Sequence, residues 1–81
     1  MADEPRVTVL TRAGCSACVT AEQDVARICA ELGHGWNAVD VDSDPELRAE
    51  YGDRVPVIMV DGREHGFWKV EEKRLRTALA G

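Results

Sequence analysis

Two cysteines, Cys15 and Cys18, lie three positions apart between two segments of different character. The preceding residues 6–10 are rich in β-branched side chains and predict a short strand that ends in the loop 11–14. The following residues 16–32 contain neither proline nor glycine, and their apolar side chains recur at helical spacing. The fold must therefore let a strand lead directly into a helix at the cysteine pair.

A second strand is predicted after this helix. Gly33 ends the helix, and residues 36–41 then alternate apolar and polar side chains. We expect Trp36 and Ala38 to face inward before Val39 takes the other face of the sheet.

The second half of the chain predicts a short helix, a buried strand and a hairpin. Residues 43–46 combine a capping side chain, a proline and an acid, and they start a helix that ends near Tyr51. Residues 57–60 form the most apolar run and indicate a central strand buried on both faces. The Asp-Gly dipeptide at 61–62 predicts a tight turn into a polar edge strand over residues 63–68.

A third helix is predicted over residues 71–80, so the elements follow the order β-α-β-α-β-β-α. Strands separated by helices are expected to pair in parallel through right-handed crossovers, and the hairpin adds one antiparallel strand at the edge. The predicted fold is therefore α/β, a single domain of residues 1–81 with a mixed four-stranded sheet flanked by three helices.

Charge and composition exclude several classes of partner. Ten basic against fifteen acidic residues give a net charge of -5, which is the wrong sign for a phosphate-binding surface. The sequence has no apolar run of membrane-spanning length, and its first residues lack the basic start and apolar stretch of a signal peptide. We therefore expect a cytoplasmic protein that binds neither nucleic acid nor membranes.

The position of the cysteine pair predicts thiol-disulfide chemistry. Cys15 is expected at the cap of the first helix, where free backbone amides and the helix dipole lower a thiol pKa from about 8.5 to roughly 3.5–7.5. Arg12, three residues earlier, is expected to add positive charge. Cys18 lies one helical turn further on and can attack a mixed disulfide formed on Cys15. The pattern therefore predicts Cys15 as nucleophile and Cys18 as resolving cysteine.

A zinc site is the main alternative for these residues. Cys15, Cys18, Cys29 and His34 superficially resemble a four-ligand set. However, Cys29 lies eleven residues beyond Cys18 on the same predicted helix, or roughly 16 Å at the helical rise. We therefore predict no metal site and interpret Cys29 as a buried residue without a chemical role.

The two histidines and two tryptophans are expected to have structural roles. His34 follows a glycine at a helix end, where it interacts favourably with the dipole. His65 on the edge strand is expected to be solvated. Trp36 and Trp68 are expected in core or half-buried positions rather than in contact with substrate.

The order of elements, the C-x-x-C motif at 15–18 and the Val55-Pro56 dipeptide before the third strand resemble the glutaredoxins. Within that group the chain is most similar to the short bacterial glutaredoxin-like proteins, and the resemblance covers essentially its whole length. It implies a thioredoxin/glutaredoxin fold and thiol-disulfide oxidoreductase activity. It also implies a cis peptide bond at Pro56 that faces the cysteines, with the Val55 backbone docking a substrate peptide or glutathione.

The resemblance further implies where glutathione would bind. Arg12 falls where glutaredoxins carry a lysine that meets a glutathione carboxylate, and Arg54 replaces the usual threonine before Val-Pro. Phe67 and Trp68 stand where the family has a glycine pair, and Lys69 follows them as a further candidate contact. The implied partners are a disulfide-containing protein or a glutathione mixed disulfide, with glutathione or a reductase as electron donor. The protein is expected to act as a monomer and to require no cofactor.

Two other functions stay open at this point. Ser-Ala replaces the Pro-Tyr common between the cysteines of dithiol glutaredoxins, and family members without that proline sometimes bind a bridging [2Fe-2S] cluster. The chain would then be a cluster-binding or carrier module with Cys15 as ligand. Alternatively, it is a binding domain whose cysteine pair is redox-inert.

Overall fold

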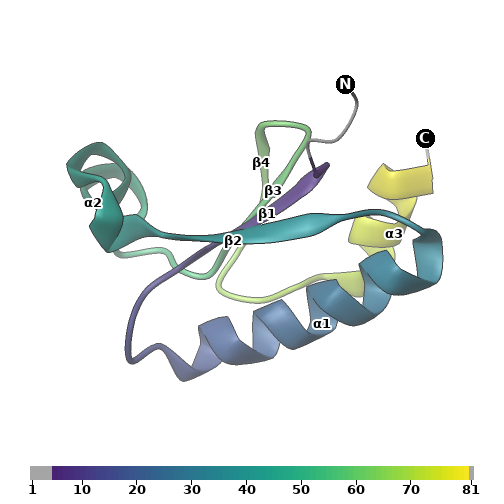
Figure 1. The fold of residues 1–81 in the computed structure, drawn as a ribbon, viewed down its shortest axis with the longest axis horizontal. Coiled ribbons are helices and arrows are strands. Elements are labelled where there is room, and N and C mark those ends of the chain that lie inside the picture. The colour runs from purple at the N-terminus through teal and green to yellow at the C-terminus, as the bar shows by residue number, and fades with distance from the viewer. Residues whose placement is uncertain (1–4, 81) are drawn as a thin grey trace.

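Residues 5–80, which the structure describes, form strands and helices in the predicted order (Figure 1). The structure is a computed structural model. Residues 1–4 and 81, which the predicted domain includes, lie outside the described part. The elements are β1 (Val7–Thr11), α1 (Ser16–Leu32), β2 (Trp36–Asp40), the 3-10 turn η1 (Val41–Ser43), α2 (Pro45–Tyr51), β3 (Val57–Val60), β4 (Arg63–Phe67) and α3 (Glu72–Ala80).

The four strands form one mixed sheet in the order β2-β1-β3-β4. β1 pairs in parallel with β2, so that Val7 lies opposite Trp36. On its other side β1 pairs antiparallel with β3, where Val7 lies opposite Val60. β3 and β4 form the predicted antiparallel hairpin, with a register shift between Ile58 and Met59. The mixed four-stranded sheet is confirmed.

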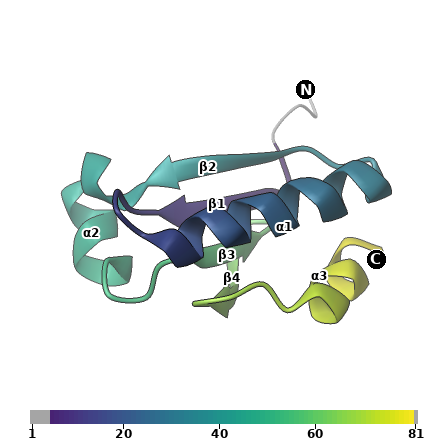
Figure 2. The same cartoon turned by 90° about the horizontal axis from the view of Figure 1, so that it is seen from below.

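The direction of β3 corrects the prediction that strands separated by helices pair in parallel. α1 has 17 residues and is about 25 Å long, so it returns the chain along the sheet before β2 begins. α2 has 7 residues, about 10 Å, which is too short for a crossover. It lies at the end of the sheet where β2 finishes (Figures 1 and 2), and β3 therefore starts from that end.

The main core lies between the sheet and the two long helices. In Figure 2 α1 and α3 lie on the same side of the sheet. The side chains buried between these layers come from β1, β3, α1 and α3: Val7, Val9, Ala21, Val25, Ile28, Cys29, Ile58, Val60, Leu75 and Leu79. Neighbouring residues of a strand point to opposite faces of the sheet. Val9 therefore packs into this core, while Leu10 packs into a second, smaller core on the opposite face.

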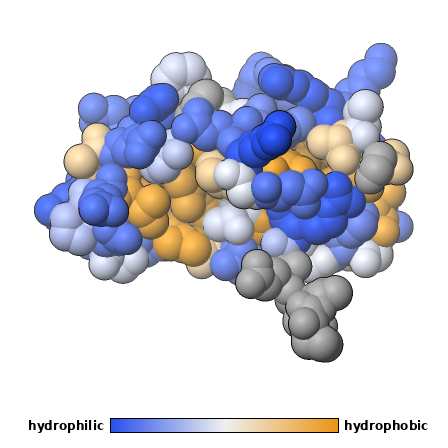
Figure 3. Space-filling model, turned by 90° about the horizontal axis from the view of Figure 1, so that it is seen from above, coloured by the Kyte–Doolittle hydropathy of each residue, from blue (hydrophilic) through white to orange (hydrophobic). Residues whose placement is uncertain are grey.

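The opposite face of the sheet has a smaller core. Leu10 and Val57 pack there with Val41 and with Tyr51 of α2. The short α2 covers this face only partly, and hydrophobic side chains remain visible between hydrophilic ones in the view from above (Figure 3). No helix in the described part of the chain has the length and apolar character needed to cross a bilayer.

β2 differs from its predicted burial pattern at Ala38. Trp36 packs against the main core and Val39 against the smaller one, as expected. Ala38 is exposed, although the alternation assigned it to the inward side. β2 is an edge strand, so its side chains have a neighbouring strand on one side only. α1 therefore shields only part of this strand.

Two side chains at the other edge also differ from their predictions. β4 ends at Phe67, and Trp68 is not half-buried but 62% exposed with a left-handed backbone at φ 69°. His65 is half-buried rather than solvated, and its Nε2 is buried without a hydrogen-bond partner among the described residues. Burial and the nearby Arg74 lower the pKa of His65.

The hairpin turn forms as predicted and is tied to the first strand. Asp61 and Gly62 both have positive φ, 54° and 81°, as the tight turn between two twisted strands requires. The Asp61 carboxylate accepts two hydrogen bonds from Arg6, at 2.9 and 2.8 Å. Arg6 precedes β1, so this ion pair fixes the turn against the start of the central strand.

An ion-pair network joins α1 to α3. The Glu72 carboxylate of α3 accepts hydrogen bonds from Arg27 of α1, at 3.0 and 3.2 Å, and from Arg76 at 2.9 Å. Arg76 also donates to Glu31 of α1 at 2.6 Å. These arginines lower the pKa of Glu72 from 4.5 to about 2.

The network predicts a pH-dependent part of the stability. Because the folded state lowers the pKa of Glu72, its contribution is complete above pH 4.5 and is lost as the pH falls through about 2. We expect Glu72→Gln to lower the free energy of unfolding by urea at pH 7 and to match the wild type near pH 2. Glu50→Gln, which removes a carboxylate from α2, serves as the control. An equal loss at both pH values would contradict this role of the Glu72 charge.

Candidate active site

Cys15 is the N-cap residue of α1, as predicted. Its backbone is extended, with φ -99° and ψ 102°, and its Sγ accepts a hydrogen bond from the backbone N–H of Cys18 at 3.1 Å. Gly14 before it has φ 77°, a left-handed conformation that side chains disfavour. This turn brings the chain from β1 into α1, and the sulfur takes the place that an oxygen acceptor usually has at a helix start.

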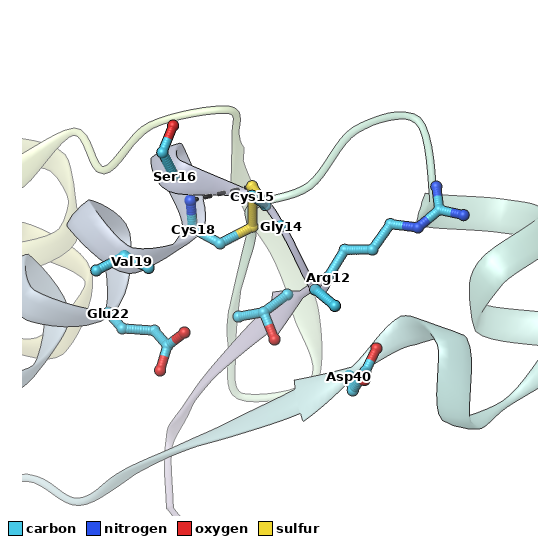
Figure 4. Close-up of a pocket in the computed structure, with 10 residues that line it drawn as sticks. Arg12, Gly14, Cys15, Ser16, Cys18, Val19, Glu22 and Asp40 are labelled. Atoms are coloured by element: carbon cyan, nitrogen blue, oxygen red, sulfur yellow. Dashed lines mark hydrogen bonds between the residues drawn. A yellow bond between two sulfur atoms is a disulfide. The ribbon is translucent and has the colours of Figure 1, made fainter.

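Cys18 lies in the first turn of α1 and forms a disulfide with Cys15 (Figure 4). The two Cα atoms are 5.2 Å apart. Cys18 is 2% exposed, whereas Cys15 is only half-buried. A molecule arriving from solvent therefore reaches Cys15 more readily than Cys18.

An open cleft of about 520 Å³ lies beside the disulfide. Its walls are the end of β1, the loop into α1, the first two turns of α1 and Asp40 at the end of β2. Cys15 is therefore reached from the surface through this cleft, whereas Cys18 is almost fully buried.

Arg12 lines this cleft, but its charge is directed elsewhere. Its Nε donates to Asp42 at 3.1 Å and its Nη1 to the backbone oxygen of Gly52 at 3.3 Å. Figure 4 shows the guanidinium extending away from the Cys15 sulfur. The structure pairs Arg12 with Asp42, and does not bring it to the cysteine whose thiolate it was expected to stabilise.

The peptide bond between Val55 and Pro56 is cis, as the resemblance implied. Pro56 is buried, and its carbonyl accepts a hydrogen bond from the Trp68 N–H at 2.7 Å. Val55 is half-buried. Both lie in the connection from α2 to β3, and Figures 1 and 2 place α2 at the same end of the molecule as the start of α1. Neither residue lines the cleft beside the disulfide.

Arg54 and Lys69, the two other candidate contacts for glutathione, also lie outside this cleft. Arg54 donates to the backbone oxygen of Glu50 at 2.6 Å, and its guanidinium lies 5.6 Å from the centre of the Tyr51 ring. Lys69 is exposed and lines a separate groove of about 250 Å³ between the early turns of α1 and the segment after β4. The structure therefore brings together Cys15, Cys18 and Arg12 in one cleft, and leaves the other candidates around it.

Two acidic residues of the cleft were missed by the sequence reasoning. Glu22 lies four positions after Cys18 on α1, a spacing that places both on one face of the helix. Asp40 ends β2 directly opposite Thr11 of β1, and parallel neighbours end at the same edge of a sheet. The sequence contains a signal for both placements: helical spacing puts Glu22 on the face of Cys18, and parallel pairing of the first two strands puts Asp40 beside Thr11.

The remaining cysteine is a core residue, as predicted. Cys29 is 0% exposed, and burial raises the pKa of its thiol. His34 lies beside the backbone oxygen of Leu79, with Nε2 at 3.3 Å, and not beside a cysteine. Within residues 5–80 no group of three or more His, Cys, Asp or Glu side chains could hold a metal ion.

The chain is similar to known proteins in sequence and in fold. Residues 6–80 match the family described as "Glutaredoxin-like domain (DUF836)". The uncharacterized protein Rv0508 of Mycobacterium tuberculosis (strain ATCC 25618 / H37Rv) is 48% identical over 81 residues, covering 94% of this chain and 84% of its own. The X-ray structure of protein XcR50 from X. campestris is 33% identical, with a TM-score of 0.73, and covers 91% of this chain and 95% of its own.

A more distant structure shows the same fold. The crystal structure of a buckwheat glutaredoxin-glutathione complex is similar over 94% of this chain and 74% of its own, with a TM-score of 0.57 at 19% identity. The predicted thioredoxin/glutaredoxin fold is confirmed by these similarities together with the observed order of elements.

The cap formed by Cys15 predicts a difference between two substitutions of that residue. Both remove the disulfide, but a serine hydroxyl can accept the Cys18 N–H and an alanine cannot. We therefore expect Cys15→Ser to exceed Cys15→Ala in free energy of unfolding by about 1 kcal/mol. Urea unfolding of both variants under reducing conditions measures the difference. Equal stabilities would show that the N-cap contact contributes nothing.

Proposed function

The chain belongs to the glutaredoxin-like domain family, and on this premise we propose that it is a thiol-disulfide oxidoreductase acting through Cys15 and Cys18. One observation carries the proposal: the half-buried Cys15 caps α1 within bonding distance of the buried Cys18, beside an open cleft. A purely structural pair would not require one of its sulfurs to be accessible.

The proposed reaction has two exchange steps. The Cys15 thiolate attacks a substrate disulfide, so that one sulfur binds Cys15 and the other leaves as a thiolate. The Cys18 thiolate then attacks the Cys15 sulfur, the protein disulfide forms, and the second substrate thiolate leaves. Two electrons pass from the protein to the substrate. The Cys18 N–H, 3.1 Å from the Cys15 Sγ, supports the first step because it stabilises the sulfur as an anion.

The proposed partners follow from the family and from the residues around the disulfide. We infer that Val55 and Pro56 dock a protein disulfide or a glutathione mixed disulfide, with Arg54 and Lys69 as candidate cations for a glutathione carboxylate and Arg12 as a third that would first have to leave Asp42. The buckwheat relative is described as a glutathione complex, which supports glutathione as one partner. Glutathione or a reductase then restores the dithiol, and the monomer acts without a bound cofactor.

The cysteine roles are tested by substitution. We expect Cys15→Ser to abolish reduction of a small neutral disulfide, because the attacking sulfur is lost, and Cys18→Ser to accumulate a mixed disulfide on Cys15. Mass spectrometry of the quenched reaction detects that adduct. Cys29→Ala, which changes a core cysteine, controls for general effects of substitution.

Full turnover by Cys15→Ser would overturn the proposal. A redox-inert pair would show itself in the reduced protein by alkylation of Cys15 that reaches half its maximal rate at the unperturbed value of about pH 8.5 or above. The electron donor is identified by NADPH consumption, with glutathione and glutathione reductase in one assay and thioredoxin reductase in the other.

A [2Fe-2S] cluster held by one chain alone fits its donor set poorly, and a cluster bridging two chains through Cys15 of each would need two further ligands from outside the protein. A [2Fe-2S] cluster needs four ligands, mostly thiolates. The described residues bring together two thiols, of which Cys18 is buried, and no third His, Cys, Asp or Glu side chain that could complete a metal site with them. We expect anaerobic reconstitution with iron and sulfide to give a colourless protein. A visible absorption band that requires Cys15 would contradict this expectation.

A further inference from the structure

The charges in the cleft beside the disulfide do not cancel. Three charged side chains line it, Arg12, Glu22 and Asp40. Arg12 forms a salt bridge with Asp42 at 3.1 Å, so its charge is already balanced. Among residues 5–80, no salt bridge to an arginine, lysine or histidine engages Glu22 or Asp40. Two carboxylates in the lining of this cleft therefore have no salt-bridge partner among these residues.

The two carboxylates come from different elements that line the same cleft. Glu22 extends from α1 one turn beyond Cys18 and is half-buried, which limits its contact with water. Asp40 stands at the end of β2, and its Oδ1 accepts the Asp42 N–H at 2.9 Å, a bond that leaves its charge in place. Figure 4 shows both carboxylates on the side of the cleft away from the disulfide, with the Arg12 guanidinium directed outward.

We propose that this cleft selects disulfides by charge, favouring those that carry an ammonium or guanidinium group close to the sulfurs over those that carry a carboxylate. The inference rests on the proposed oxidoreductase function and names its substrate class. A cationic group in the cleft gains an attraction to Glu22 and Asp40, whereas a carboxylate is repelled by both. Glu22 is the main determinant because it is less exposed than Asp40 and so less screened by water.

Three small disulfides of similar size test the selection. They are bis(2-aminoethyl) disulfide, bis(2-hydroxyethyl) disulfide and dithiodiglycolate, which are cationic, neutral and anionic. Protein reduced beforehand is mixed with each, and the released thiol is measured after acid quenching. In each reaction the Cys15 and Cys18 thiols become a disulfide and the substrate becomes two thiols, so no added reductant is required.

Glu22→Gln and Glu22→Lys are compared with the wild type, after circular dichroism has shown that each variant is folded. The three substrates differ in intrinsic leaving-group reactivity, but that difference cancels when the ratio of cationic to anionic rate constants is compared between proteins. We expect Glu22→Gln to lower this ratio about two- to fivefold, as for one charge at a partly exposed site. Glu22→Lys should lower it further, and 0.5 M salt should reduce the effect.

Glu46→Gln, which removes a carboxylate of α2 outside the cleft, is the control for overall protein charge. We expect its ratio to equal that of the wild type. Suppose that the neutral disulfide oxidises the wild type, but that Glu22→Gln and Glu46→Gln have the same ratio of cationic to anionic rate constants. Charge selection by the cleft is then wrong, and the oxidoreductase function stands. If none of the three disulfides oxidises the reduced wild type, the proposed function fails, and this inference with it.

Discussion

The pairing of β1 with a strand on each side fixes where α1 begins, and with it the position of the two cysteines. Val7 and Val9 are 0% exposed in the centre of the sheet, so this strand cannot shift without emptying the main core. Its last residue leads through Gly14 to Cys15, the N-cap of α1. The cysteine pair is therefore held at the end of a central strand, with Cys15 half-buried and Cys18 buried.

The length of α2 decides at which end of the sheet the connection into β3 lies. Since 7 helical residues cannot return the chain along the sheet, β3 starts from the end where β2 finishes. The connection into β3, which carries the cis peptide bond of Pro56, thereby begins at the end of the sheet where α1 starts. The same short helix leaves part of the second face of the sheet uncovered (Figure 3).

Ion pairs engage several charged side chains between the elements and leave two carboxylates of the cleft without a salt bridge among the described residues. Glu72, Arg27 and Arg76 satisfy one another between α1 and α3, away from the cleft. Arg12 is drawn to Asp42, and so the cleft keeps the charge of Glu22. A residue next to a functional site contributes there only the charge that its neighbours leave unpaired, and that balance depends on contacts between elements distant in sequence.

The sequence by itself determined the order of the elements, the cap at Cys15, the turn at 61–62 and the burial of Cys29, because each depends on neighbours within one or two helical turns or one hairpin. Only the tertiary structure decided the direction of β3, the exposure of Trp68 and the partner of Arg12. Each of these depends on contacts between elements that are distant in the sequence. Periodicity shows which face of an element is apolar, but not which distant side chain will meet it.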